Sequence, residues 1–406
     1  MVCGYCLRNF WRGVLFWGFV AWVFSFFVSK SVGAQDKFFY FGVAVPVVLL
    51  LVFGDGGKIP KVILGVVALL FILSVPVFWS GDAEYLNLVG RYARYFILTS
   101  CVFLAPFLLR KDIDRLSRFL LWAIIVGAFI AALLQWLKFA LVLNFELAPQ
   151  GIAGVGGVGV NPNVTGAAMG VAFLVAGHMS FSLDKGWVRT FLTLACLLFF
   201  ASICLAFART AFVAVFMVLV MNRFPIRDFF VYYILLFVLC VFLLAVAWGV
   251  YGLDPILAFA DRLLSGRVSI WRQLLHDVSG HWWFGLGLQR ELEFYNPGPG
   301  VQYMTAHNIY FQAFRNGGFF ALTALVSLVV LIVRNVDRGN SSYVWRSILS
   351  FGLLYALIDA YYYPVSDPNS NWLFLWLPAG YLLVAAIERN GGQERGGRGA
   401  SFGADI

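Results

Sequence analysis

Long apolar runs alternate with short polar segments along the whole chain, and this pattern predicts an all-helical membrane protein. A bilayer core needs about 20 apolar residues for each spanning helix. Twelve predicted spans fall near residues 13–29, 38–53, 59–79, 92–109, 116–143, 164–181, 188–206, 210–222, 228–252, 308–333, 344–363 and 371–387. They leave no room for a large soluble domain, so residues 1–406 are expected to form one polytopic membrane domain.

One long polar region, residues 253–306, lies between the ninth and tenth spans. Within it, apolar residues recur at helical spacing opposite polar ones, which predicts an amphipathic helix over about 267–278. We expect its apolar face to enter the outer headgroup region while Arg267, Arg272 and His276 face a polar cavity, although an inert amphipathic helix fits the same pattern. The segment HWWFGLGL (281–288) is then expected to anchor the loop in the interface.

A glycine-rich stretch, GIAGVGGVGVNPN (151–163), joins the fifth and sixth spans. It satisfies G-x-G-x-x-G literally, but no strand precedes it within a βαβ unit, so a nucleotide site is not expected. We expect a flexible re-entrant or lid-like loop instead. Asn161 should cap the sixth span, because asparagine accepts hydrogen bonds from the orphan N–H groups at a helix start.

Composition supports the membrane assignment: 62% of residues are hydrophobic and 12% are charged, whereas a soluble domain carries roughly 25% charge. The net charge of +9 does not by itself identify a partner, and nucleic acid is not expected, because in a membrane protein the location of Lys and Arg matters more than their sum.

The six cysteines offer neither an extramembrane disulfide pair nor a metal site with a second ligand pair. The first span resembles a signal peptide, but its apolar core is long, so an uncleaved helix is expected.

The basic residues are unevenly distributed between the two sides. If both termini are cytoplasmic, 18 of the 29 Lys and Arg residues lie inside, as the positive-inside rule requires. The remaining 11 are mostly arginine: Arg91, Arg94, Arg209, Arg262, Arg267, Arg272, Arg290 and Arg315, with Lys30, Lys37 and Lys138.

Arginine on the translocated side is informative, because topology does not favour charge there and the guanidinium grips phosphate oxygens bidentately. As a set, these arginines predict an anion site, with Arg91, Arg209, Arg267, Arg272 and Arg290 as its candidate members. The alternative is that individual arginines snorkel or pair with Asp82, Glu84, Asp261 or Glu291.

The candidate catalytic residue is His307, which with Asn308 stands at the mouth of the tenth span. A neutral imidazole at this position could accept a proton from a substrate hydroxyl, and Asn308 could help to bind that substrate. The alternative is a histidine that only caps or orients the helix start. Clustered outer carboxylates for a metal-dependent reaction are not evident, so no metal or other cofactor is expected.

Several of these features occur together in a known family. The chain resembles the bacterial O-antigen ligases, and their relatives the O-antigen polymerases, in its span count and its long late loop. It also resembles them in an arginine within A-R-T (Arg209), in G-R-x-x-x-W from Gly266, in H-W-W-F-G-L-G from His281 and in H-N-x9-G from His307. It departs from relatives at Trp282, where proline is frequent, and at Ala321, where glycine or another turn-tolerant residue is frequent.

The resemblance implies a metal-independent GT-C-type glycosyltransferase of the bacterial inner membrane. Such an enzyme would move a polysaccharide from undecaprenyl pyrophosphate to lipid A-core on the periplasmic side. By position, Arg209, Arg267 and His307 match the family's functional arginines and histidine. The departures leave polymerase and protein glycan ligase activity open.

A transporter of lipid-linked oligosaccharides is the alternative of a different class. Its polar groups would sit near the bilayer midplane on broken helices, often in repeated halves. This chain shows no obvious halves, and its unusual polar residues gather at one end of the spans and in one loop.

Overall fold

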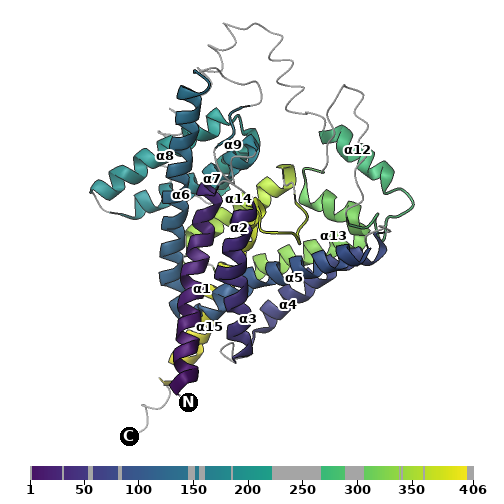
Figure 1. The fold of residues 1–406 in the computed structure, drawn as a ribbon, viewed down its shortest axis with the longest axis horizontal. Coiled ribbons are helices and arrows are strands. Elements are labelled where there is room, and N and C mark those ends of the chain that lie inside the picture. Colours follow the sequence, from purple (N-terminus) through teal and green to yellow (C-terminus); the bar gives the residue numbers. More distant parts are fainter. Residues whose placement is uncertain are drawn as a thin grey trace.

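In the computed structural model, the described residues are 2–29, 32–53, 58–80, 85–144, 151–154, 161–183, 186–221, 267–288, 306–337, 339, 342–359 and 362–399. They form helices joined by turns and short irregular segments (Figure 1). In chain order the elements are α1 (Val2–Val28), α2 (Val32–Phe39), η1 (Tyr40–Ala44), α3 (Val45–Val52), α4 (Lys61–Ser74), η2 (Val75–Trp79), α5 (Tyr85–Leu108), η3 (Arg110–Asp112), α6 (Ile113–Leu141), α7 (Pro162–Ser182), α8 (Trp187–Leu205), α9 (Arg209–Met221), α12 (Arg267–Asp277), α13 (Ile309–Asn335), α14 (Tyr343–Asp359), η6 (Trp372–Trp376) and α15 (Leu377–Gly399).

Nine of the helices in these ranges are long and apolar enough to cross a membrane. They correspond to nine of the twelve predicted spans, and α9 and α14 correspond to two more, although both are shorter. The remaining predicted span, 228–252, lies outside the described residues. Helices are the expected form because hydrocarbon offers no partner for a backbone N–H or C=O, and a helix satisfies these groups within one segment.

The helices pack through buried aromatic and small residues. In α7, buried glycine and alanine residues let neighbouring helices approach closely: a Cβ at Gly166 would lie 2.0 Å from the Cβ of Ala208, just ahead of α9. In α1, Gly18 lies against Gly42 of η1, where a Cβ would lie 2.1 Å from the Gly42 carbonyl oxygen. These close approaches hold α1 with η1, and α7 with α9.

The start of α1 and the end of α15 lie at the same end of the molecule (Figure 1). The even number of crossings inferred from the basic residues requires this arrangement. Figure 1 also shows that α12 lies near α13, at a distance from that end. The side of the membrane that each end faces stays a prediction.

Candidate functional site

His307 occupies a strained turn directly ahead of α13. Its φ is +51°, in the left-handed region that side chains other than glycine rarely adopt. Its side chain is only 11% exposed. A strained, buried histidine persists only where surrounding contacts hold it, and such residues cluster at functional sites.

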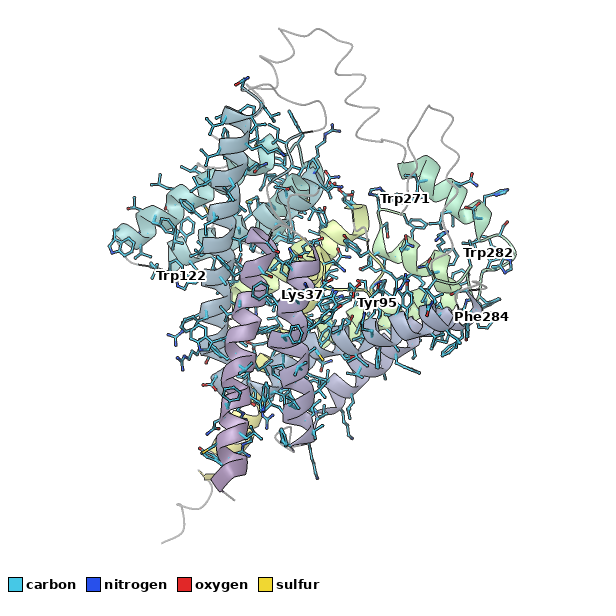
Figure 2. All side chains as sticks on the ribbon, in the orientation of Figure 1. Lys37, Tyr95, Trp122, Trp271, Trp282 and Phe284 are labelled. Carbon is cyan, nitrogen blue, oxygen red and sulfur yellow. The ribbon has the colours of Figure 1, made fainter. Side chains whose placement is uncertain are left out.

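Contacts to Ala306 fix this turn from two directions. The Ala306 N–H donates to Gln312 Oε1 (3.0 Å), and the Ala306 carbonyl accepts from Trp271 Nε1 (2.9 Å). The Trp271 ring also stacks on Phe311, with ring centroids 5.1 Å apart. Trp271 therefore joins α12 to the start of α13, and Figure 2 labels it on that helix.

Asn308 caps α13. Its Oδ1 accepts from the N–H groups of Tyr310 (2.8 Å) and Phe311 (3.0 Å), while its Nδ2 donates to the carbonyl of Leu357 on α14 (2.7 Å). Asn308, and not His307, is therefore the residue that caps α13. The substrate contact predicted for Asn308 stays a prediction, and it competes with these structural bonds.

The imidazole of His307 pairs with Asp359, the last residue of α14. His307 Nδ1 lies 3.1 Å from Asp359 Oδ1, and the Asp359 side chain is fully buried. A carboxylate at this distance favours the tautomer with the proton on Nδ1, which places the lone pair on Nε2. The Asp359 carboxylate thus orients the imidazole so that its Nε2 can accept a proton.

Asp359 is not among the candidate residues predicted from the sequence. The signal was present, because Asp359 is the one acidic residue of the predicted span 344–363. An ionisable residue within a membrane span is costly and is by default a functional candidate.

The amphipathic helix predicted in the long loop is confirmed as α12 (Arg267–Asp277). Ile270, Leu274 and Val278 are buried, and the last two cluster with Ala306 and Phe314 of the neighbouring segment. This part of the apolar face therefore packs on protein, whereas Leu275 is 38% exposed, and contact of the helix with headgroups stays a prediction. Arg267 begins α12, Arg272 lies within it, and His276 is exposed.

The HWWFGLGL segment closes a break in α13. Gly317 and Gly318 have non-helical backbone angles, and the groups freed at the break bond to residues 282–287. The N–H of Phe319 donates to the Trp282 carbonyl (2.8 Å), and the N–H of Leu286 donates to the Arg315 carbonyl (2.8 Å). Figure 2 shows Trp282 and Phe284 at the edge of the molecule, and the anchoring of this segment in the membrane interface stays a prediction.

The two departures from the family pattern both lie at this break. Trp282 supplies the carbonyl for Phe319 and sets its ring against Phe314, with centroids 5.8 Å apart. Ala321 is fully buried, and its Cβ lies 2.4 Å from where a Cβ of Gly317 would stand. Both residues therefore shape the bend of α13.

Three polar residues line the first half of α13 and are buried: Gln312, Arg315 and Asn316. Gln312 Nε2 and Arg315 Nη1 donate to Asn316 Oδ1, at 3.3 and 3.4 Å. Since Gln312 also holds Ala306, this network connects the buried Arg315 with the turn that carries His307.

Arg209 begins α9 after a left-handed residue, Phe207, whose φ is +49°. Gly151 lies against this turn: a Cβ there would stand 2.2 Å from the Ala206 carbonyl oxygen. Residues 151–154 are largely buried, and the Ile152 N–H donates to the Leu205 carbonyl (3.0 Å). Residues 151–154 are thus bonded to α6 and α8, because Gln135 Nε2 also donates to the Ile152 carbonyl (2.8 Å). The flexible re-entrant or lid-like loop stays a prediction, and residues 155–160 of it lie outside the described residues.

The start of α9 lies at the same end of the helix bundle as Asp359. Ala208 packs on Gly166 of α7, and the Tyr355 hydroxyl of α14 donates to the Asn163 carbonyl at the start of α7 (3.2 Å). The predicted cap of α7 is confirmed, because Asn161 Oδ1 accepts from the Asn163 N–H (2.8 Å). Arg209 and the His307–Asp359 pair thus lie on one side of the molecule.

The other arginines predicted on the outer side differ in their surroundings. Arg94 of α5 pairs with Asp367, whose two carboxylate oxygens both lie 3.1 Å from Nη2, so its partner is not one of the four acids considered from the sequence. Arg91 is partly exposed, one turn earlier in α5. Arg290 lies outside the described residues.

No group of three or more His, Cys, Asp or Glu side chains in the described ranges is placed to hold a metal ion.

Comparison with known proteins gives a family match. A family model described as O-antigen ligase matches residues 194–326. The matched range contains Arg209, Arg267, Arg272, Arg290, His307 and Asn308. No curated protein matches the chain.

Proposed function

We propose a function from the premise that the chain belongs to the O-antigen ligase family, to which residues 194–326 match. Membership in this family makes the chain a multi-pass membrane protein with a ligase- or polymerase-type function. Its specific activity, we infer, is that of an O-antigen ligase. It transfers a polysaccharide from undecaprenyl pyrophosphate to lipid A-core on the periplasmic face of the bacterial inner membrane.

The single observation that carries this proposal is the His307–Asp359 pair at the mouth of α13. The donor is already activated, so the reaction needs a base for the acceptor hydroxyl and cations for the departing pyrophosphate. His307 Nε2 takes the proton of the hydroxyl as its oxygen attacks the anomeric carbon with inversion. Asp359 holds the Nδ1 proton and stabilises the imidazolium that forms.

The bond between the anomeric carbon and the pyrophosphate oxygen breaks as the new glycosidic bond forms. The leaving oxygen keeps the electron pair, and undecaprenyl pyrophosphate is released. Arg209 and Arg267 bind this diphosphate, assisted by Arg272, Arg290 and Arg91, because a planar guanidinium pairs with phosphate oxygens through two hydrogen bonds. The scheme is that of a GT-C-type glycosyltransferase and uses no metal.

Polymerase and protein glycan ligase activities remain the second candidates, because both share the donor chemistry and differ only in the acceptor. A transporter is disfavoured by one observation: His307, Asp359 and the start of α9 gather at one end of the bundle. Alternating access would instead need a site near the bilayer midplane.

Reconstitution in proteoliposomes tests the reaction. Purified protein is given undecaprenyl-pyrophosphate-linked polysaccharide and lipid A-core, and the products are separated by size. Addition of one polysaccharide to lipid A-core supports a ligase, whereas a ladder on the lipid carrier supports a polymerase. Activity should survive EDTA, and loss that Mg²⁺ restores would contradict the metal-independent scheme.

The proposed orientation places both termini in the cytoplasm and residues 253–306 in the periplasm. Cysteine labelling in intact cells tests it, with Lys111→Cys, at an exposed position, and Gly298→Cys compared with the unsubstituted chain. An impermeant maleimide should label position 298 and not position 111. The opposite result would overturn the orientation and the periplasmic site together.

A further inference from the structure

Trp271 is the residue of the G-R-x-x-x-W segment to which the proposed mechanism gives no role. It lies in α12 four residues after Arg267, which corresponds to a rise of about 6 Å along the helix. Its indole Nε1–H donates to the carbonyl of Ala306 (2.9 Å), and Ala306 directly precedes His307 in the chain. A hydrogen bond of Trp271 therefore joins the helix that carries a proposed pyrophosphate-binding arginine to the turn that carries the proposed base.

This bond sets the orientation of the peptide group between Ala306 and His307. The group is planar, so a donor that holds the carbonyl oxygen of Ala306 also holds the backbone nitrogen of His307. The φ of His307 is the rotation about the bond from this nitrogen to Cα, and its value of +51° lies in the left-handed region. Trp271 thus acts on a backbone angle that decides where the imidazole lies.

Other contacts hold the same turn, but they come from different elements. Gln312 of α13 accepts from the N–H at the start of the turn (3.0 Å), and Asp359 of α14 faces the imidazole itself (3.1 Å). These two contacts relate His307 to α13 and α14. The bond from Trp271 relates it to α12, and so to the helix that begins at Arg267.

The apolar contacts of α12 do not replace this bond. Leu274 and Val278 cluster with Ala306, and burial of apolar surface is non-directional. The indole N–H is directional, and the Trp271 ring stacks on Phe311 with 5.1 Å between the centroids and 17° between the ring planes. Together, the bond and the stacking fix how α12 sits on the start of α13.

We propose that Trp271 is a positioning residue that holds His307 and the arginine at the start of α12 in one frame, an inference that rests on the proposed function. The transfer needs the base at the acceptor hydroxyl while a cation meets the departing pyrophosphate. Both groups must be placed together, because a displacement of about 1 Å can cost about 10²-fold in rate. In this role Trp271 acts through the peptide group ahead of His307 and not on a substrate atom.

Removal of the indole N–H tests the inference. Trp271→Phe keeps a ring for Phe311 and removes the donor, whereas benzothienylalanine at position 271 keeps both rings and has sulfur in place of the N–H. Trp79→Phe is the matched control, because the Trp79 Nε1–H also donates to a backbone carbonyl, that of Phe284 (2.6 Å), in the segment that closes the break in α13. Each protein is assayed in proteoliposomes for kcat and for the KM of the lipid-linked donor.

Both variants at position 271 should lose about tenfold in kcat, the upper end of what one neutral hydrogen bond contributes. The KM of the donor should change by less than about twofold, because the arginines remain and only the placement of the base is affected. Trp79→Phe should stay within about twofold of the wild type in both quantities. Wild-type kcat in both variants at position 271 would overturn the inference, and so would an equal loss in Trp79→Phe.

A double-mutant cycle with His307→Ala separates positioning from a general loss of structure. If Trp271 acts through His307, Trp271→Phe should cause no further loss of residual turnover once the imidazole is absent. The same tenfold loss in both backgrounds would show that the bond supports the fold in general, and would overturn the inference. A wild type that transfers no glycan would reject the proposed function and this inference with it, whereas an active wild type with an unaffected Trp271→Phe would reject the inference alone.

Discussion

Each end of α13 is held by a buried carboxylate, and the two differ in their partners. At the start of the helix, Asp359 of α14 faces His307 at 3.1 Å. At its end, Asp337 pairs with Arg389 Nη1 (2.8 Å), accepts a short hydrogen bond from the Ser342 hydroxyl and accepts another from the Gly339 N–H (3.1 Å). Both carboxylates are at most 5% exposed.

The chemistry of the partner separates a structural pair from a reactive one. Arginine keeps its charge at any pH a protein meets, so the Asp337 pair fixes the loop between α13 and α14 to α15 without changing state. Histidine changes charge near neutral pH, and His307 is also held in a strained backbone conformation. A buried carboxylate is therefore evidence for chemistry only when its partner can exchange a proton.

The largest expected effect comes from removing the imidazole. His307→Ala should reduce turnover by about 10²- to 10⁴-fold, because positioned proton transfer contributes about that much to rate. Donor affinity should be retained. His281→Ala is the matched control, since His281 is exposed and its backbone makes the contacts: its N–H donates to the Val278 carbonyl and its carbonyl accepts from the Gly285 N–H.

Measuring turnover and donor binding separately decides the role of His307. Near-normal turnover with weakened donor binding would eliminate the base and leave His307 as a binding residue. An equal loss in His281→Ala would indicate a general loss of folded protein.

The next effect concerns Asp359, which acts through His307 and is a positioning residue. Asp359→Asn should lower kcat by about 10- to 100-fold, since a hydrogen bond to a charged group contributes about 1.5–3 kcal/mol. KM for the donor should hardly change, and Asp359→Glu should recover part of the rate. An unchanged kcat, or a loss confined to KM, would contradict the positioning role.

The fold was largely predictable because apolar periodicity and length are local properties of the sequence. Asn161 as a helix cap and the amphipathic helix at α12 follow from short-range patterns, and both are confirmed. From the sequence, the apolar face of α12 is expected in the headgroup region, and nothing local reveals that Ala306 and Phe314 lie beneath part of it. That contact joins residues about 30 to 40 positions apart, and no short-range pattern specifies it.

The candidate site was predictable only in part. His307 stands out in the sequence as a histidine at a helix mouth, but its partner Asp359 is 52 residues away and is brought close by the packing of α14 on α13. Similarly, Arg94 pairs with Asp367, 273 residues later in the chain, and no local pattern relates the two. Pairing between distant residues is decided by tertiary structure, and one sequence does not contain it explicitly.

A smaller effect is expected at the start of α9. Arg209→Lys keeps the positive charge and loses the planar fork, so kcat/KM should fall by about tenfold through one lost charge-assisted hydrogen bond to the pyrophosphate. Arg334→Lys, at the exposed end of α13, is the control for the chemical change itself. Wild-type activity in Arg209→Lys would show that this charge is structural.

The smallest effect on activity should come from Asp337→Asn, which makes the same chemical change as Asp359→Asn at the opposite end of the helix. The substitution removes the ion pair with Arg389, whose side chain is 43% exposed and can return to solvent. It leaves an amide oxygen that can still accept from Ser342 and Gly339.

For Asp337→Asn we expect a loss of about 1–3 kcal/mol in the free energy of unfolding, seen as a lower midpoint of thermal unfolding in detergent. The kcat/KM of the folded fraction should stay within about twofold of the wild type, because no proton-transfer group is disturbed. If Asp337→Asn lowered kcat as much as Asp359→Asn, the two carboxylates would share one role in holding α13, and the rate loss at Asp359 would no longer indicate support of a base.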